Sequence, residues 1–161
     1  AGASGKNTSK KKGENKMNRE IKFRGKRLTD GNWIYGDFFR NRGLSFIASD
    51  GISENPLATW RDYNVDPETV GQFTGFHDKN GKEIYEGDLI KSPSGLVYTV
   101  IFGTWIHDEK KEFPKIIDKY EHTGWCISLD GNTPCELLDS EVCSGVIAGN
   151  VHDNPSLLKE K

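Results

Sequence analysis

The sequence predicts a mainly β protein with little helix, folded as a small barrel or a strongly bent sheet. Two observations carry this prediction. Short runs rich in β-branched and aromatic residues recur along the chain, and Asp-Gly or Asn-Gly pairs separate many of them. Such pairs tolerate the positive φ angles of tight turns. The 161 residues suffice for one compact domain or two small lobes.

The first part of the chain contains the first predicted hairpin. Apolar side chains alternate with basic ones over residues 20–28, Asp30-Gly31 supplies the turn, and an aromatic-rich run covers 33–39. A third strand is predicted over 44–47. We expect residues 52–69, which contain two prolines, to be irregular apart from one helical turn at their end. Residues 17–69 are therefore an N-terminal β-hairpin region.

A second hairpin is predicted around Asn80-Gly81, with strands over 70–76 and 82–85. The charged stretch that follows the next strands favours a short helix over 109–120, which Pro114 would keep from being continuous. The remaining predicted elements are strands over 89–90, 96–102, 124–129 and 145–151 and a terminal turn begun by Asn154 and Pro155.

Charge is distributed unevenly along the chain. Residues 1–27 hold ten Lys or Arg and two Glu, a net charge of +8. Because the whole chain has a net charge of −2, the remaining residues carry −10. Residues 1–16 lack aromatic and branched aliphatic side chains, and we expect a disordered tag or tail there, with translation of the natural gene starting at Met17. A genuine basic arm for DNA or RNA is the alternative. The acidic body argues against a broad nucleic-acid interface.

Four strings are specific enough to indicate a family. They are IKFRG at 21–25, VGQFTG at 70–75, DKNGKEIYEGD at 78–88 and IAGNVHDNP at 147–155. Together they resemble the YopX family, small bacteriophage and prophage proteins without an assigned activity. The resemblance implies a phage or prophage origin and an SH3-type, partly open β-barrel over 70–158, with a variable insert at 107–122. Ala148 departs from the pattern.

These strings are interpreted as fold determinants, with a binding loop as the alternative. Glycine permits a sharp bend, and the side chain of an aspartate or asparagine can accept backbone hydrogen bonds across a turn. The predicted fold-determining turn residues are Asp30, Gly31, Asn80, Gly81, Gly87, Asp88, Asn154 and Pro155.

No residue is assigned to catalysis, to a cofactor or to a metal. The histidines adjoining acids are poor evidence for a dyad, because neighbouring residues in a strand point to opposite faces. The three cysteines, at 126, 135 and 143, fit neither a disulfide framework nor a zinc ribbon, so we expect reduced thiols. The sequence contains no phosphate-binding loop and no serine-hydrolase motif.

Two sets of residues are candidates for binding. Alternation places Trp33 and Tyr35 on one face of the first hairpin, where they could form an interface. The same alternation places Lys22, Arg24 and Lys26 together, where they could contact nucleic acid.

The sequence therefore predicts a non-enzymatic interaction module that forms homo-oligomers and binds a host or phage protein. It has no membrane-spanning segment and is expected in the bacterial cytoplasm. Nucleic-acid binding is the alternative, and an enzyme using His with Asp or Cys is a third hypothesis.

Overall fold

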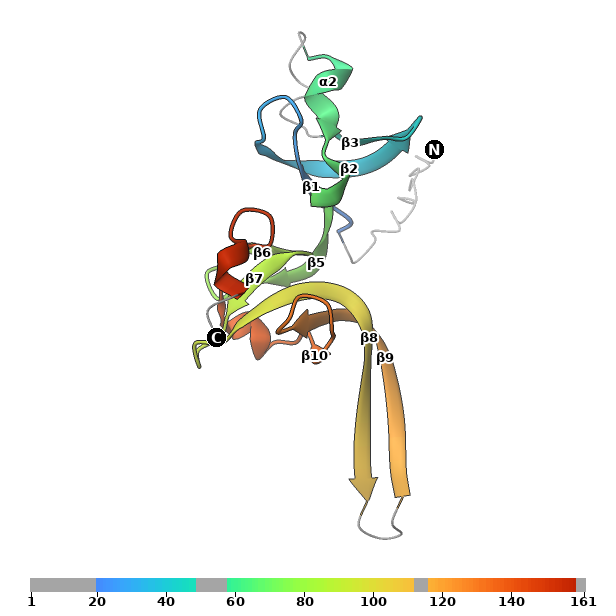
Figure 1. Cartoon of the computed structure of the whole chain (residues 1–161), viewed down its shortest axis with the longest axis vertical. Coiled ribbons are helices and arrows are strands. Elements are labelled where there is room, and N and C mark those ends of the chain that lie inside the picture. The colour runs from blue at the N-terminus through green and yellow to red at the C-terminus, as the bar shows by residue number, and fades with distance from the viewer. Residues whose placement is uncertain (1–19, 49–57, 112–115, 159–161) are drawn as a thin grey trace, which may run out of the picture.

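The computed structural model describes residues 20–48, 58–111 and 116–158. It consists of two antiparallel sheets with little helix, as the sequence predicts, and Figure 1 shows the N-terminal strands at one end and the long hairpin of β8 and β9 at the other. The six-stranded sheet has the order β4-β3-β2-β1-β5-β6, and the five-stranded sheet has the order β10-β9-β8-β7-β11. The predicted segment 1–16 lies outside the described residues.

The bounds of the elements follow the chain. They are β1 (Phe23–Lys26), β2 (Trp33–Asn41), β3 (Leu44–Ala48), the helical turn α2 (Trp60–Tyr63), β4 (Asn64–Val65), the 3₁₀ turn η1 (Pro67–Thr69), β5 (Gly71–His77), β6 (Glu83–Tyr85), β7 (Asp88–Lys91), β8 (Val97–Lys111), β9 (Ile116–Ser128), β10 (Glu136–Leu137), the 3₁₀ turn η2 (Val142–Ser144), β11 (Val146–Asn150) and the 3₁₀ turn η3 (Pro155–Leu158).

The first hairpin pairs β1 with β2. Successive side chains of β2 point alternately to a core on one face and to a hollow on the other. Ile34 is buried and packs with Ile47 and Val65 in a small core between the N-terminal strands. Trp33 and Tyr35 point to the opposite face, where they line a hollow. A strand that buries every second side chain on one face leaves the other face free for a site.

The six-stranded sheet joins the two regions predicted from sequence. β1 pairs with β5 in the register Phe23↔Gln72 and Arg24↔Gly71, so β5 and β6 extend the sheet begun by the N-terminal hairpin. Gly71 permits this close packing, because a Cβ at that position would lie 2.6 Å from the carbonyl oxygen of Glu86.

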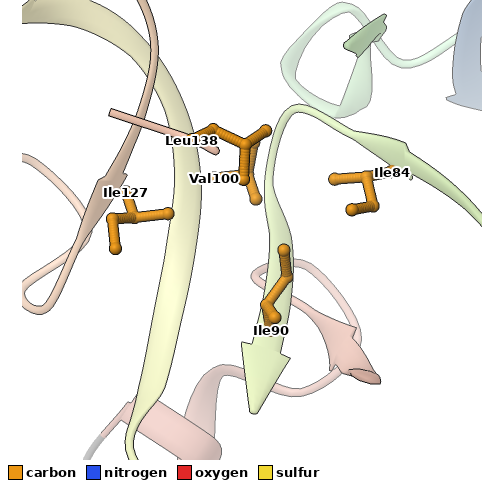
Figure 2. Close-up of a cluster of buried hydrophobic side chains, with 5 residues drawn as sticks. All are labelled: Ile84, Ile90, Val100, Ile127 and Leu138. Atoms are coloured by element: carbon orange, nitrogen blue, oxygen red, sulfur yellow. The ribbon is translucent and has the colours of Figure 1, made fainter. Parts of the chain in front are cut away.

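The second core lies under β7, β8 and β9. Five buried aliphatic side chains form it, namely Ile84, Ile90, Val100, Ile127 and Leu138, and Figure 2 shows them converging from separate elements. β6 contributes to this core although it belongs to the other sheet. The corner between β6 and β7 therefore couples the two sheets.

Two long strands replace the short helix predicted over 109–120. β8 and β9 remain paired from Thr99↔Ser128 as far as Lys111↔Ile116, and Figure 1 shows their distal part extending away from the body. The helix prediction was wrong: residues 109–111 and 116–120 belong to strands. Residues 106–108 and 119–123 are exposed on both faces of this ribbon, which therefore needs no apolar periodicity. Pro114 lies outside the described residues.

The five-stranded sheet is open among the described residues. β10 and β11 form its two edges, and no pairing closes it into a barrel within the ranges given above. No helix in the described part of the chain is long and apolar enough to cross a membrane.

Candidate functional site

A hollow of about 590 Å³ lies where the first hairpin faces the β6–β7 corner and the C-terminal turn after β11. Its lining combines aromatic, charged and amide groups that come from four separate parts of the chain. The residues are Lys22, Arg24, Trp33, Tyr35, Lys82, Glu83, Tyr85, Asp88, Gly149, Asn150, Asp153 and Asn154. This volume is typical of small-molecule sites.

A buried ion pair forms one wall of the hollow. Arg24 Nη1 donates to Asp88 Oδ1 at 2.6 Å, and Arg24 Nη2 donates to the carbonyl oxygen of Glu86 at 3.1 Å. The side chains of Arg24 and Asp88 are only 7% and 2% exposed. Burial raises the pKa of Asp88, and the Arg24 charge partly opposes this. Because both charged groups are removed from water, each needs the opposite charge of its partner to offset the cost of burial.

Aromatic rings enclose the Arg24 guanidinium. It lies 4.8 Å from the Trp33 ring centroid and 5.1 Å from that of Tyr85, both within the range of cation–π contacts. Tyr35 packs edge-on against Tyr85, with 5.5 Å between the ring centroids. These contacts hold the aromatic wall in place.

A second ion pair closes the side of the hollow near β6. Lys22 Nζ donates to both carboxylate oxygens of Glu83, at 2.8 and 2.9 Å, and Tyr85 Oη donates to Glu83 Oε2 at 2.6 Å. Burial would raise the pKa of Glu83, but the Lys22 and Tyr85 hydrogen bonds outweigh it and lower the pKa. Glu83 is therefore an ionised group whose acceptor positions are occupied.

Asp153 organises the C-terminal side. Its Oδ1 forms an ion pair with Lys26, and its Oδ2 accepts hydrogen bonds from Trp33 Nε1 and Asn150 Nδ2, each at 2.8 Å. The Lys26 hydrogen bond, followed by those from Asn150 and Trp33, holds the pKa of Asp153 well below its usual range. The His152 ring lies tilted against that of Trp33, with 5.9 Å between the ring centroids, and burial lowers the pKa of His152.

Three donors in the hollow lack a partner among the described residues. Arg24 Nε is buried without a hydrogen bond. Lys82 has no ion pair and no side-chain hydrogen bond in the described part of the chain, and Tyr35 Oη has none there either. Tyr35 is 42% exposed, and burial of its ring raises the pKa of its hydroxyl, which therefore remains a protonated donor near neutral pH.

The predicted nucleic-acid stripe lies beside the hollow. Lys22, Arg24 and Lys26 do share a face, but Glu83, Asp88 and Asp153 neutralise them one by one. The predicted interface residues Trp33 and Tyr35 line the hollow instead of forming a flat apolar patch.

The predicted turn residues lie where the chain reverses. Gly31, Gly81 and Gly87 have φ values of 71°, 80° and 82°. The Asp30 carboxylate accepts a hydrogen bond from the backbone N–H of Asn32. Asn80 lies in the turn that precedes Gly81.

The remaining predicted turn residues, Asp88, Asn154 and Pro155, lie at or next to the hollow. Asp88 Oδ2 accepts from the Tyr85 backbone N–H at 2.8 Å. Asn154 exchanges hydrogen bonds with Asn150, and Pro155 begins η3. Asp88 thus belongs both to a turn and to the site.

Asp78 joins the second hairpin to β11. Its Oδ1 accepts from the backbone N–H groups of Asn80 and Lys82, and its Oδ2 accepts from that of Ile147 at 3.0 Å. Burial opposes ionisation of Asp78, but these hydrogen bonds lower its pKa. This aspartate therefore fixes the fold, and His77 beside it packs against Phe73 instead.

The cysteines and the other histidines lie apart from the hollow. Cys126 is buried, Cys135 is exposed and Cys143 is half-buried, and burial raises the pKa of all three thiols. His107 and His122 both stack on Trp105 in the hairpin of β8 and β9. Within the described ranges no three His, Cys, Asp or Glu side chains are placed to hold a metal ion.

A second candidate surface is the distal part of β8 and β9, residues 102–111 and 116–125, which we call the arm. Phe102 and Ile106 are 56% and 60% exposed on one face, and Tyr120 is 41% exposed on the other. β7 pairs only with 97–99 of β8, and β10 pairs only with 126–127 of β9. The Trp125 carbonyl still accepts a hydrogen bond from the Leu138 N–H. Beyond it, neither outer edge of the arm pairs with another strand among the described residues.

Sequence reasoning missed most of the hollow. Glu83 and Tyr85 were read only as part of a strand, and Asp153 only as part of a terminal turn. Glu83 and Asp153 bind Lys22 and Lys26, which are 61 and 127 residues away in sequence. Local patterns carry no signal for such pairings, although the balance of basic residues in β1 against acidic ones in the body is consistent with them.

Comparison with known proteins identifies a family and similar solved structures. A model of the YopX protein family matches residues 22–159. The crystal structure of protein EF1440 from Enterococcus faecalis is similar over 87% of this chain and 99% of that chain, with 20% sequence identity and a TM-score of 0.39. Among curated proteins, none matches the chain.

Proposed function

The chain belongs to the YopX protein family, and we propose that it is a non-enzymatic accessory protein of phage or prophage origin that binds other proteins and itself. The phage or prophage origin rests on the family resemblance. Self-association is assigned to the arm, and the observation that carries it is the exposure of Phe102 and Ile106 on a ribbon with two unpaired edges.

A two-stranded ribbon gains little stability in water by itself. The arm nevertheless keeps large apolar side chains in solvent and continues well beyond the core under β7, β8 and β9. Covering the arm with another polypeptide would bury these side chains and satisfy the free backbone groups of its edges. Such an interaction would stabilise the extended ribbon, which gains little stability by itself.

A second copy of the chain is the occupant that fits the arm face best. Thr104 and Thr123, which are paired and uncharged, lie next to Phe102 and Ile106 on this face. The charged pair Asp108↔Lys119 lies further out. In a two-fold arrangement the apolar centres can face each other while the acid of one copy meets the lysine of the other. Glu121, which is paired with Ile106, also lies on this face, so its exposed carboxylate must stay solvated at the margin of such a contact.

Nucleic-acid binding remains the alternative and has weaker support. Its cations Lys22, Arg24 and Lys26 already have carboxylate partners, so binding a phosphate would require breaking an ion pair. We also propose an SH3-type arrangement for 70–158, which the bent β8 and the sharp corner at Gly87 support. The bacterial cytoplasm is the proposed location.

Sedimentation analysis across the micromolar range tests self-association. The wild-type chain should form a concentration-dependent oligomer, and Ile106→Lys should sediment as an 18.1 kDa monomer. Leu96→Lys is the matched control, because Leu96 is 48% exposed but lies in the β7–β8 turn, away from the arm. A wild-type chain that stays monomeric throughout, or equal effects of the two variants, would overturn the assignment to the arm.

Affinity purification from infected or lysogenic bacteria then tests for a further protein partner. A phage or host protein recovered with the wild-type chain supports the proposed role. Recovery of nucleic acid that is lost in high salt would instead favour the alternative.

A further inference from the structure

The donors and acceptors of the hollow are out of balance. Glu83, Asp88 and Asp153 each use both carboxylate oxygens within the protein. By contrast, Lys82 Nζ, Tyr35 Oη and the buried Arg24 Nε have no partner among the described residues. What remains available in the hollow is therefore donor capacity, and a ligand that supplies acceptors is its chemical complement.

The charges around the hollow also favour a ligand that supplies acceptors. The ion pairs Lys22–Glu83 and Arg24–Asp88 neutralise four of the lining charges, and Lys26 neutralises Asp153. Lys82 is the lining cation that has no ion pair among the described residues, although it is near enough to Asp78 and Asp88 to influence the pKa of both. A negatively charged group is thus favoured over a neutral acceptor.

The shape and the aromatic wall restrict the ligand further. About 590 Å³ accommodates a small organic molecule, and Tyr35, a residue that is 42% exposed, lines the hollow beside Trp33. Flat apolar groups bind against such rings through dispersion and by displacing water. A bare inorganic anion would leave this wall uncovered.

We propose that the hollow binds a small organic anion, with a carboxylate or phosphate group facing Lys82 and Arg24 and a planar body against Tyr35. The Arg24–Asp88 pair stays intact in this arrangement and holds the wall that the ligand contacts. The site is independent of the arm and does not require self-association.

Isothermal titration of the full chain with four probes tests the proposal. Adenosine 5′-monophosphate and indole-3-acetate combine a planar body with a phosphate or a carboxylate, whereas adenosine lacks the anion and inorganic phosphate lacks the planar body. At least one of the first two should bind about tenfold more tightly than the last two, which corresponds to about 1.4 kcal/mol. Their relative affinities separate phosphate ligands from carboxylate ligands.

Two variants locate the binding. Lys82→Gln should weaken the preferred probe about tenfold, the loss expected for one charge-assisted contact. Lys79→Gln is the matched control, because Lys79 is exposed in the same turn but does not line the hollow. Tyr35→Phe should weaken binding as well.

Several outcomes would overturn the proposal. They are the absence of binding by both organic anions at millimolar concentration, affinities of both organic anions no higher than those of adenosine and inorganic phosphate, and equal losses in Lys82→Gln and Lys79→Gln. Circular dichroism of each variant distinguishes a lost contact from a lost fold.

Discussion

Arg24 in β1 and Asp88 in β7 form a buried ion pair, with 2.6 Å between Nη1 and Oδ1, across 64 residues of sequence. This pair connects the six-stranded sheet to the five-stranded sheet at the corner where the hollow lies. It fixes both the relative position of the sheets and one wall of the candidate site.

Removing the acid of this pair should destabilise the fold strongly. Asp88→Asn leaves the Arg24 charge buried without a counter-charge, and we expect the free energy of unfolding to fall by about 3–5 kcal/mol. Urea denaturation measures the loss. Asp37→Asn, at an exposed position of β2, should change it by less than about 0.5 kcal/mol. Equal losses in the two variants would show that the pair does not couple the sheets.

Asp153 should make the free energy of unfolding depend on pH. Its pKa in the folded chain lies below the usual value of 3.8, because Lys26, Asn150 and Trp33 stabilise the carboxylate. Its contribution is therefore present above the unfolded pKa and is lost as the pH falls towards the folded one. Between about pH 5 and about pH 3 the free energy of unfolding should decline less steeply in Asp153→Asn than in the wild type. Parallel declines would contradict this role.

Gly149 should be intolerant of a side chain. A Cβ there would overlap the Asn154 side-chain amide, which closes the turn after β11. Gly149→Ala should cost about 1–3 kcal/mol in thermal or urea unfolding, as overpacking does. Gly124→Ala is the control, because a Cβ at that position in β9 has no neighbour within 4 Å. If both glycines tolerate alanine, the close packing of the turn is not needed.

Shortening the arm should separate stability from self-association. Thr104 and Thr123 are directly paired, so an Asn-Gly turn can replace 105–122 without changing the register near the body. The shortened chain should keep its free energy of unfolding within about 1 kcal/mol, since no residue of the arm beyond these threonines belongs to the core. On the proposal made above, it should also be monomeric by light scattering. Loss of folding would mean that the arm supports the body.

The local elements of this protein follow from its sequence. Asp-Gly and Asn-Gly pairs mark the reversals, and alternation correctly separates Ile34 from Trp33 and Tyr35. These features could be predicted because turn chemistry and strand periodicity involve residues that are neighbours in the chain. The arm could not be predicted in this way, because a two-sided exposed ribbon has no apolar periodicity to distinguish it from a charged helix.

Only the tertiary structure decided which charges meet. The basic residues of β1 were visible as a stripe, but their carboxylate partners Glu83, Asp88 and Asp153 come from β6, β7 and the C-terminal turn. Sheet order brings these groups together at the corner marked by Gly87, and sheet order is not encoded in a local pattern. The basic residues that the sequence suggested as a nucleic-acid contact therefore lie at a hollow, where ion pairs with carboxylates neutralise their charges.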